Sequence, residues 1–191
     1  SSTIFAAFKI KKTNKDFLKD ANIIIWTTTP WTIPANKALA YNQSIEYSLV
    51  EINVLENFKE KKIIVASNLL KSIMQSCKIK KYEVIKKFSG SEFSGTYCSH
   101  PFLDKGYNDD IPMLEARFVN LEQGTGIVHC APSHGPDDFN LCLKNNIPSK
   151  YTVDNAGLYT KEVPNFTGIH IFKADPIVIE KLKEEKKLLG D

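Results

Sequence analysis

The sequence predicts an α+β fold, with a barrel-like core of short β-strands and helices packed outside it. The first half of the chain is dominated by short segments rich in Ile, Val, Phe and Tyr, a composition typical of strands. Helical patterns are few and are placed irregularly among these segments. No internal repeat or low-complexity linker divides the 191 residues, so we expect a single domain, 1–191.

Seven segments are predicted to be strands, because each is short, rich in β-branched or aromatic residues and bounded by turn-forming residues. They are IFAAFKI (4–10), NIIIWTT (22–28), IEYSLVEI (45–52), KKIIVAS (61–67), YEVIKKF (82–88), IPMLEARFV (111–119) and TGIVHCA (125–131).

Three segments have helical periodicity. Residues 68–77 place four apolar side chains on one face, with Ser67 or Asn68 as the expected cap. A second helix is expected to begin at Pro136, in GPDDFNLCLKNN, and to end at the Asn pair. The third is the tail ADPIVIEKLKEEKKLLG, where we expect Asp175 to cap the helix, Pro176 to start it and Gly190 to end it.

Composition limits the possible functions. The net charge of +3 is too small to indicate a nucleic-acid-binding protein by itself, and Arg117 is the only arginine among 25 basic residues. Four cysteines without a CxxC pair indicate reduced thiols. No apolar run approaches the roughly 20 residues of a membrane span, so no membrane partner is expected. The chain does not begin with Met, and we expect it to be a piece of a longer protein.

The stretch WTTTPWTIPAN (26–36) ends a predicted buried strand with four threonines in six positions. Any one threonine is explained by its preference for strands. The proline at position 30 ends strand pairing and lets the chain curl, so several hydroxyls can line one pocket and hold polar groups or a water. No neighbouring lysine or terminal amine activates a threonine as a nucleophile, so these are predicted to be binding hydroxyls.

The stretch GTGIVHCAPSHGPDDF (124–139) delivers His129 to a strand end and opens a helix with Asp137 and Asp138. Acidic residues in a first helical turn are favoured by the helix dipole by about 0.3–1 kcal/mol each, which explains one of them comfortably. Successive helix positions lie about 100° apart, so one carboxylate can face solvent while the other faces a pocket and binds an ammonium group.

A metal site is the alternative interpretation of this stretch. His129, His134 and Asp138 form a loose set of potential ligands, with Cys130 and Cys142 nearby. Zinc hydrolases carry tighter local pairs on one helix, whereas Pro132, Gly135 and Pro136 break any helix through these positions. The sequence therefore predicts no metal.

Together, WTTTPWTIPAN and GTGIVHCAPSHGPDDF resemble the editing domain of isoleucyl-tRNA synthetases of the bacterial and organellar type, a domain inserted in a class I synthetase. The resemblance extends from IFAAFKI through HPF (100–102) to NFTGIHIFKADPIVIEKL (165–182). Cys130 and Ser133 differ from the residues usual in bacterial relatives. The HIGH and KMSKS signatures that bind ATP are absent from this sequence, so the resemblance implies that this chain does not activate isoleucine.

The resemblance implies post-transfer editing, in which the domain hydrolyses the ester of mischarged Val-tRNA(Ile). Asp138 would bind the ammonium of the valine and act in catalysis with Thr28 and Thr29. His129 would limit the size of the side chain admitted. The pocket residues that the resemblance implies are Trp26, Thr27, Thr28, Thr29 and Thr32.

The resemblance also implies partners and location. The partners would be the 3′ end of tRNA(Ile) carrying valine and the rest of the synthetase chain, with the fragment itself a monomer. No cofactor is expected for editing, since ATP and Mg²⁺ serve only the synthetic core. The location would be the cytoplasm in a bacterium and otherwise a plastid or mitochondrion. Two other function classes stay open, a passive tRNA-binding module and a metal-dependent hydrolase.

Overall fold

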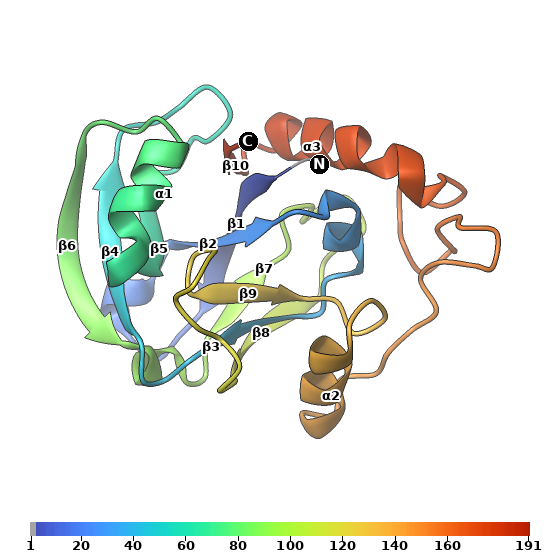
Figure 1. Cartoon of the computed structure of the whole chain (residues 1–191), viewed down its shortest axis with the longest axis horizontal. Helices are drawn as coiled ribbons and strands as arrows, with labels where there is room; N and C mark the ends of the chain where they lie inside the picture. The colour runs from blue at the N-terminus through green and yellow to red at the C-terminus, as the bar shows by residue number, and fades with distance from the viewer. Residues whose placement is uncertain (1–2) are drawn as a thin grey trace.

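A computed structural model describes residues 3–191, and within them ten strands form one mixed sheet (Figure 1). The strands are β1 (Ile4–Lys12), β2 (Asn22–Thr27), β3 (Ala38–Tyr41), β4 (Glu46–Ile52), β5 (Lys62–Ala66), β6 (Tyr82–Ser89), β7 (Tyr97–Ser99), β8 (Asp110–Glu115), β9 (Ile127–Cys130) and β10 (Leu188–Gly190).

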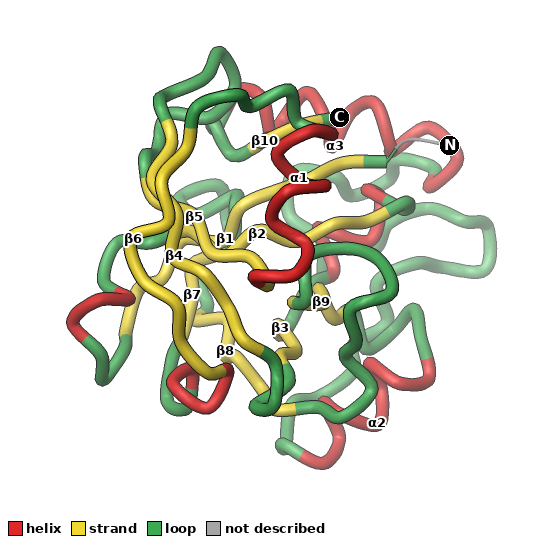
Figure 2. The backbone as a smooth tube through the Cα atoms, turned by 60° about the vertical axis from the view of Figure 1, so that its left-hand side comes forward, coloured by secondary structure: helices red, strands yellow, loops and turns green. Residues whose placement is uncertain are grey.

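The order of strands across the sheet is β6-β4-β5-β2-β1-β7-β8-β3-β9, and β10 pairs with β1. Most pairs are antiparallel, whereas β2–β5 and β3–β8 are parallel. The sheet curls along this path, so β9 comes back alongside β2 without closing the ladder (Figures 1 and 2). The hydroxyl of Thr125, just before β9, donates to the Ile24 carbonyl at 2.6 Å and ties the two strands together. The barrel-like prediction is therefore confirmed, with the sheet left open.

Both faces of the central strands are buried, which explains their unbroken apolar sequences. In β2, Ile23 and Ile25 point into the larger hydrophobic cluster, whereas Ile24 points into a second cluster on the opposite face. The same alternation occurs in β1, where Phe8 enters the larger cluster and Ala7 the second.

The helices lie outside the sheet, as predicted (Figure 1). Helix α1 (Leu70–Ser76) covers the second cluster with Leu70, Ile73 and Met74. Helix α2 (Pro136–Lys144) follows β9, and α3 (Ala174–Glu184) contacts η2 (Pro30–Ala35), a short 3₁₀ helix just after β2. Within residues 3–191, no helix is both long and apolar enough to cross a membrane.

Several predicted boundaries were wrong. Strands β3, β7 and β10 carry only weak local patterns and were not predicted. The strands predicted over 111–119 and 125–131 are shorter, at β8 and β9. The first helix begins as a 3₁₀ turn, and neither Ser67 nor Asn68 caps it. The Ser67 hydroxyl instead bonds to that of Ser48 at 2.7 Å.

The tail differs most from the prediction. Helix α3 ends at Glu184, because Lys186 adopts φ +57° and the Lys187 N–H turns back to the Leu182 carbonyl at 2.9 Å. Gly190 therefore does not end the helix and lies in β10, paired with β1. Asp175 does not cap α3 either, because its carboxylate accepts a hydrogen bond from the Trp31 N–H at 2.9 Å.

Candidate active site

The threonine-rich stretch leaves the sheet at the end of β2. Thr27 is the last strand residue and is buried, and the Thr29 N–H donates to its hydroxyl at 3.0 Å. This small turn curls the chain, and Pro30 then starts η2, because proline cannot donate to a ladder. Thr28 and Thr29 are exposed, and the Thr29 hydroxyl lies 3.3 Å from that of Thr27.

Thr32 and His129 meet across 97 residues of sequence. The Thr32 hydroxyl lies 2.7 Å from Nε2 of His129 and donates its own proton to the Thr29 carbonyl at 2.9 Å. On the other side of the ring, Nδ1 of His129 lies 2.7 Å from the amide nitrogen of Asn36. That amide nitrogen also donates to the Ala38 carbonyl at 3.0 Å, which fixes the orientation of the Asn36 amide.

These partners determine the tautomer of His129. Because Asn36 donates to Nδ1, that nitrogen is unprotonated, and because Thr32 has already donated its proton, Nε2–H must donate to the Thr32 hydroxyl. Burial, reinforced by nearby His134, lowers the pKa of His129 to about 4. At neutral pH, His129 is an uncharged ring with both nitrogens occupied. It is therefore held in place and poorly suited to act as a general base.

Asp138 lies in the first turn of α2 and reaches back to the loop after β9. Its Oδ2 accepts a hydrogen bond from the Ala131 N–H at 3.0 Å, and Oδ1 has no hydrogen-bond partner among the described residues 3–191. Burial raises the pKa of Asp138, although the Ala131 N–H acts in the opposite direction. Asp137 is exposed. Asp138 therefore faces the loop after β9 and Asp137 is exposed, whereas the pocket and the ammonium predicted for one of these carboxylates stay a prediction.

The two tryptophans differ in their surroundings. Trp26 is half-buried, and its indole lies against Gly124 in the turn that leads to β9. Trp31 packs edge-on against His134, with ring centroids 4.8 Å apart, and its carbonyl accepts a bond of 2.5 Å from the Tyr159 hydroxyl. The Trp31 N–H is held by Asp175, so three separate segments of the chain contact Trp31 in the threonine-rich segment.

The predicted site residues therefore form two groups. Thr27, Thr29, Thr32 and His129 are connected by hydrogen bonds, and Asp138 holds the segment that follows His129. Thr28 and Trp26 flank the strand end without a side-chain hydrogen bond to this group among the described residues.

Sequence reasoning missed Asn36, Trp31, Tyr159 and Asp175 as supporting residues. Asn36 and Trp31 lie inside the threonine-rich stretch, so their positions carried a signal that was not used. Tyr159 and Asp175 lie more than 120 residues further along the chain, and no local pattern connects them with Trp31.

The metal alternative requires its candidate ligands to lie together. Among residues 3–191, no group of three or more His, Cys, Asp or Glu side chains is arranged to hold a metal ion. The three proposed ligands have separate protein partners, since His129 bonds to Thr32, His134 lies 3.0 Å from the Thr152 hydroxyl and Asp138 bonds to Ala131. The residues present do not form the set that this alternative requires.

The candidate active site is recognised by its hydrogen bonds, because the larger cavities of the protein are lined by other residues. Cavities of about 470 and 610 Å³ are lined by other residues, although the second includes Asp137. A smaller one of about 110 Å³ shares only Asn36 with the network described above.

Comparison with known proteins gives the family. Residues 5–171 match the family described as leucyl-tRNA synthetase, editing domain. The chain belongs to this editing-domain family. It is 64% identical over its whole length to an isoleucine–tRNA ligase of Pelagibacter ubique, and 40% identical over 98% of its length to one of Gluconobacter oxydans. The chain spans about a fifth of the length of these relatives, 21% and 20%.

Solved structures show the same fold. The crystal structure of GlLeuRS-CP1 has a TM-score of 0.74 at 15% identity, with 98% of each chain covered. The editing domain of the Plasmodium falciparum cytosolic leucyl-tRNA synthetase has a TM-score of 0.71 at 10% identity, with 97% of each chain covered. At these identities the comparison supports the α+β editing-domain fold and not the assignment of individual site residues.

Proposed function

We propose that this chain is the editing domain of an isoleucine–tRNA ligase and that it hydrolyses Val-tRNA(Ile). The high identity to isoleucine–tRNA ligases over the whole chain supports the parent enzyme. A hydrophobic pocket discriminates one methylene by only about 1–3 kcal/mol, a limit for which isoleucyl-tRNA synthetase is the familiar example. Valine therefore enters the synthetic site, and a second site must remove it.

The observation that carries this proposal is the fixed, neutral His129 ring. A second site that accepts valine and rejects isoleucine must exclude one methyl group, and steric exclusion requires a wall that does not yield. His129 is held at Nδ1 by Asn36 and at Nε2 by Thr32, with its pKa lowered to about 4. These contacts favour a size-limiting role for the ring over a role in proton transfer.

The remaining site residues have roles consistent with ester hydrolysis. The free Oδ1 of Asp138 is available to the α-ammonium of the valine, which is the one charge that every aminoacyl ester carries. The side chains of Thr28 and Thr29 are exposed, and their hydroxyls would hold the attacking water or the ester oxygen. An aminoacyl ester beside a ribose hydroxyl needs little beyond a placed water and a stabilised oxyanion. The proposed reaction uses no metal and no covalent intermediate.

The proposed partners follow from this reaction. They are the 3′ end of tRNA(Ile) carrying valine and the rest of the ligase chain, and the excised domain is proposed to be a monomer. Deacylation time courses with Val-tRNA(Ile) and Ile-tRNA(Ile), using this chain and the full-length ligase, test the proposal. We expect release of valine and retention of isoleucine. Binding of tRNA without turnover by the full-length ligase, once its synthetic site is blocked, would indicate a passive binding module instead.

A further inference from the structure

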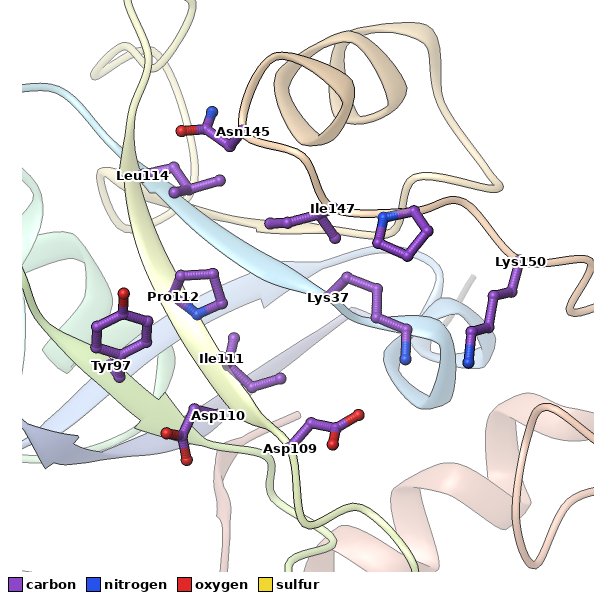
Figure 3. A pocket seen from close by; sticks show the side chains of 11 residues that line it. Lys37, Tyr97, Asp109, Asp110, Ile111, Pro112, Leu114, Asn145, Ile147 and Lys150 are labelled. Atoms are coloured by element: carbon purple, nitrogen blue, oxygen red, sulfur yellow. The ribbon is translucent and has the colours of Figure 1, made fainter.

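A cleft outside the candidate active site has a charged end and an apolar end (Figure 3). Its main cavity of about 470 Å³ lies between β8 and the segment that follows α2. In Figure 3, Leu114 and Ile147 lie toward one end of the cavity, whereas Lys37, Lys150 and Asp109 lie toward the other. The two ends offer different chemistry to one ligand.

A deeper pocket of about 110 Å³ continues from the charged end, since both cavities are lined by Lys37, Asp109 and Lys150. Asn36 lines this deeper pocket and is only 2% exposed. Its amide nitrogen is fully used by Ala38 and His129, whereas its Oδ1 has no hydrogen-bond partner among residues 3–191. This oxygen is enclosed by protein atoms, so it lies behind the pocket wall and is not open to a ligand.

The charges at the junction of the two cavities are balanced. Lys37 and Asp109 form no ion pair within the described part of the chain, and Lys150 lies 3.5 Å from Glu162. Asp110 is occupied elsewhere, by Lys11 at 2.7 Å and Lys12 at 2.9 Å. Two cations and two anions therefore face the junction, a balance that suits a zwitterion. An RNA backbone requires a net positive surface, so this site does not fit it.

We propose that this cleft binds a free α-amino acid with an apolar side chain. The α-carboxylate would meet the ammonium groups of Lys37 and Lys150, and the α-ammonium would meet Asp109. The side chain would lie along the apolar end, against residues such as Ile147. This site goes beyond the proposed hydrolysis and does not depend on it, because binding requires none of the threonines.

Nuclear magnetic resonance titration of the ¹⁵N-labelled chain with L-valine tests the proposal. The chain contains both of its hydrophobic clusters, and related editing domains of the same extent have been crystallised. We expect saturable shifts of the Tyr97 and Ile111 amides, with a Kd of about 1 mM. Isovalerate lacks the ammonium and L-valine methyl ester lacks the free carboxylate, and both are expected to bind at least about tenfold more weakly.

Three variants complete the test. Lys37→Met and Asp109→Asn should each weaken L-valine binding by about tenfold or more, while Lys71→Met, on the distant α1, should leave it unchanged. Dispersed amide spectra confirm that each variant is folded. The proposal is overturned if L-valine gives no saturable shift, if the two analogues bind as well as L-valine, or if neither cleft variant changes the Kd.

Discussion

The two walls of the candidate active site differ in how much of their hydrogen-bonding capacity the protein itself uses. On the closed wall, both nitrogens of His129 are occupied and the hydroxyl of Thr32 is buried and bonded. On the open wall, Thr28 and Thr29 are exposed and one oxygen of Asp138 is free within residues 3–191. The same short segment of chain, from β2 into η2, contributes to both walls.

This difference matches the two tasks that the proposed size-selective hydrolysis requires. Excluding one methyl group requires a wall with a fixed shape. Side chains whose polar groups are already hydrogen-bonded within the protein are held in one position and form such a wall. Binding a charged substrate and a water requires groups whose partners are not yet present. We therefore expect changes on the open wall to reduce rate and changes on the closed wall to reduce discrimination.

The largest effect is expected from Asp138→Ala. Loss of a charge-assisted hydrogen bond to the ammonium is worth about 1.5–3 kcal/mol, or roughly tenfold to a hundredfold in rate before misplacement of the ester is counted. Initial rates of Val-tRNA(Ile) deacylation by the full-length ligase measure this loss. Asp137→Ala is the matched control, because Asp137 is the exposed neighbour on the same helix. Wild-type rates in Asp138→Ala would remove Asp138 from the open wall.

Replacing Thr28 and Thr29 together by Ala is expected to have the next largest effect. Two neutral hydrogen bonds of about 1 kcal/mol each predict a loss of roughly tenfold or more in the rate of valine release. Affinity for tRNA should change much less, because these hydroxyls are proposed to act at the reacting centre. Single-turnover rates and tRNA binding distinguish the two quantities. Equal losses in both would indicate that the end of β2 has collapsed.

Thr32→Val tests the closed wall with a nearly isosteric change. It removes the acceptor for the Nε2–H of His129 and frees the ring to move, so hydrolysis of Ile-tRNA(Ile) should rise by about fivefold, while valine release is largely kept. The control is Thr96→Val, which removes a buried hydroxyl from the Thr13 contact at 3.1 Å, away from the site. A rise in isoleucine release in both variants would indicate general loosening of the fold.

The smallest effect concerns pH and stability. Burial lowers the pKa of His129 to about 4 and that of His100 to about 3, below their ordinary value near 6.5. Below about pH 6.5 the unfolded chain binds more protons, so stability conferred by the neutral rings is complete above that pH and is lost as pH falls toward 4. The raised pKa of Asp138 acts in the opposite direction.

Melting temperatures measured between pH 7 and pH 4 test this expectation. The melting temperature should fall across that window, and His129→Asn should flatten the slope. A melting temperature that stays constant or rises on acidification would contradict the assignment of neutral rings.

Local patterns in the sequence predicted the elements that depend on local interactions. Helix α2 begins at Pro136 and ends where Asn146 adopts φ +61°, as the proline and the Asn pair indicated. The buried strand before the threonines was also recognisable, because apolar β-branched residues on both faces require a strand covered on both sides.

Elements that depend on distant partners could not be predicted in this way. The bond of Thr32 to His129 spans 97 residues, and that of Asp175 to Trp31 spans 144. The charge spacing of the tail predicts one helix to its end, whereas pairing with β1 converts its last residues into β10. The resemblance to a known family supplied the site residues, and the structure supplied Asn36 and the tautomer of His129.

The most direct test of the closed wall is hydrolysis of cognate Ile-tRNA(Ile) by the His129→Ala variant of the full-length ligase. If the ring acts as a size limit, the variant should still deacylate Val-tRNA(Ile) and should begin to deacylate Ile-tRNA(Ile), which we expect the wild-type enzyme to spare. If His129 instead transfers protons, the variant should lose activity toward both substrates. That second result would contradict the proposal that His129 is a neutral ring, hydrogen-bonded at both nitrogens, that excludes isoleucine by its shape.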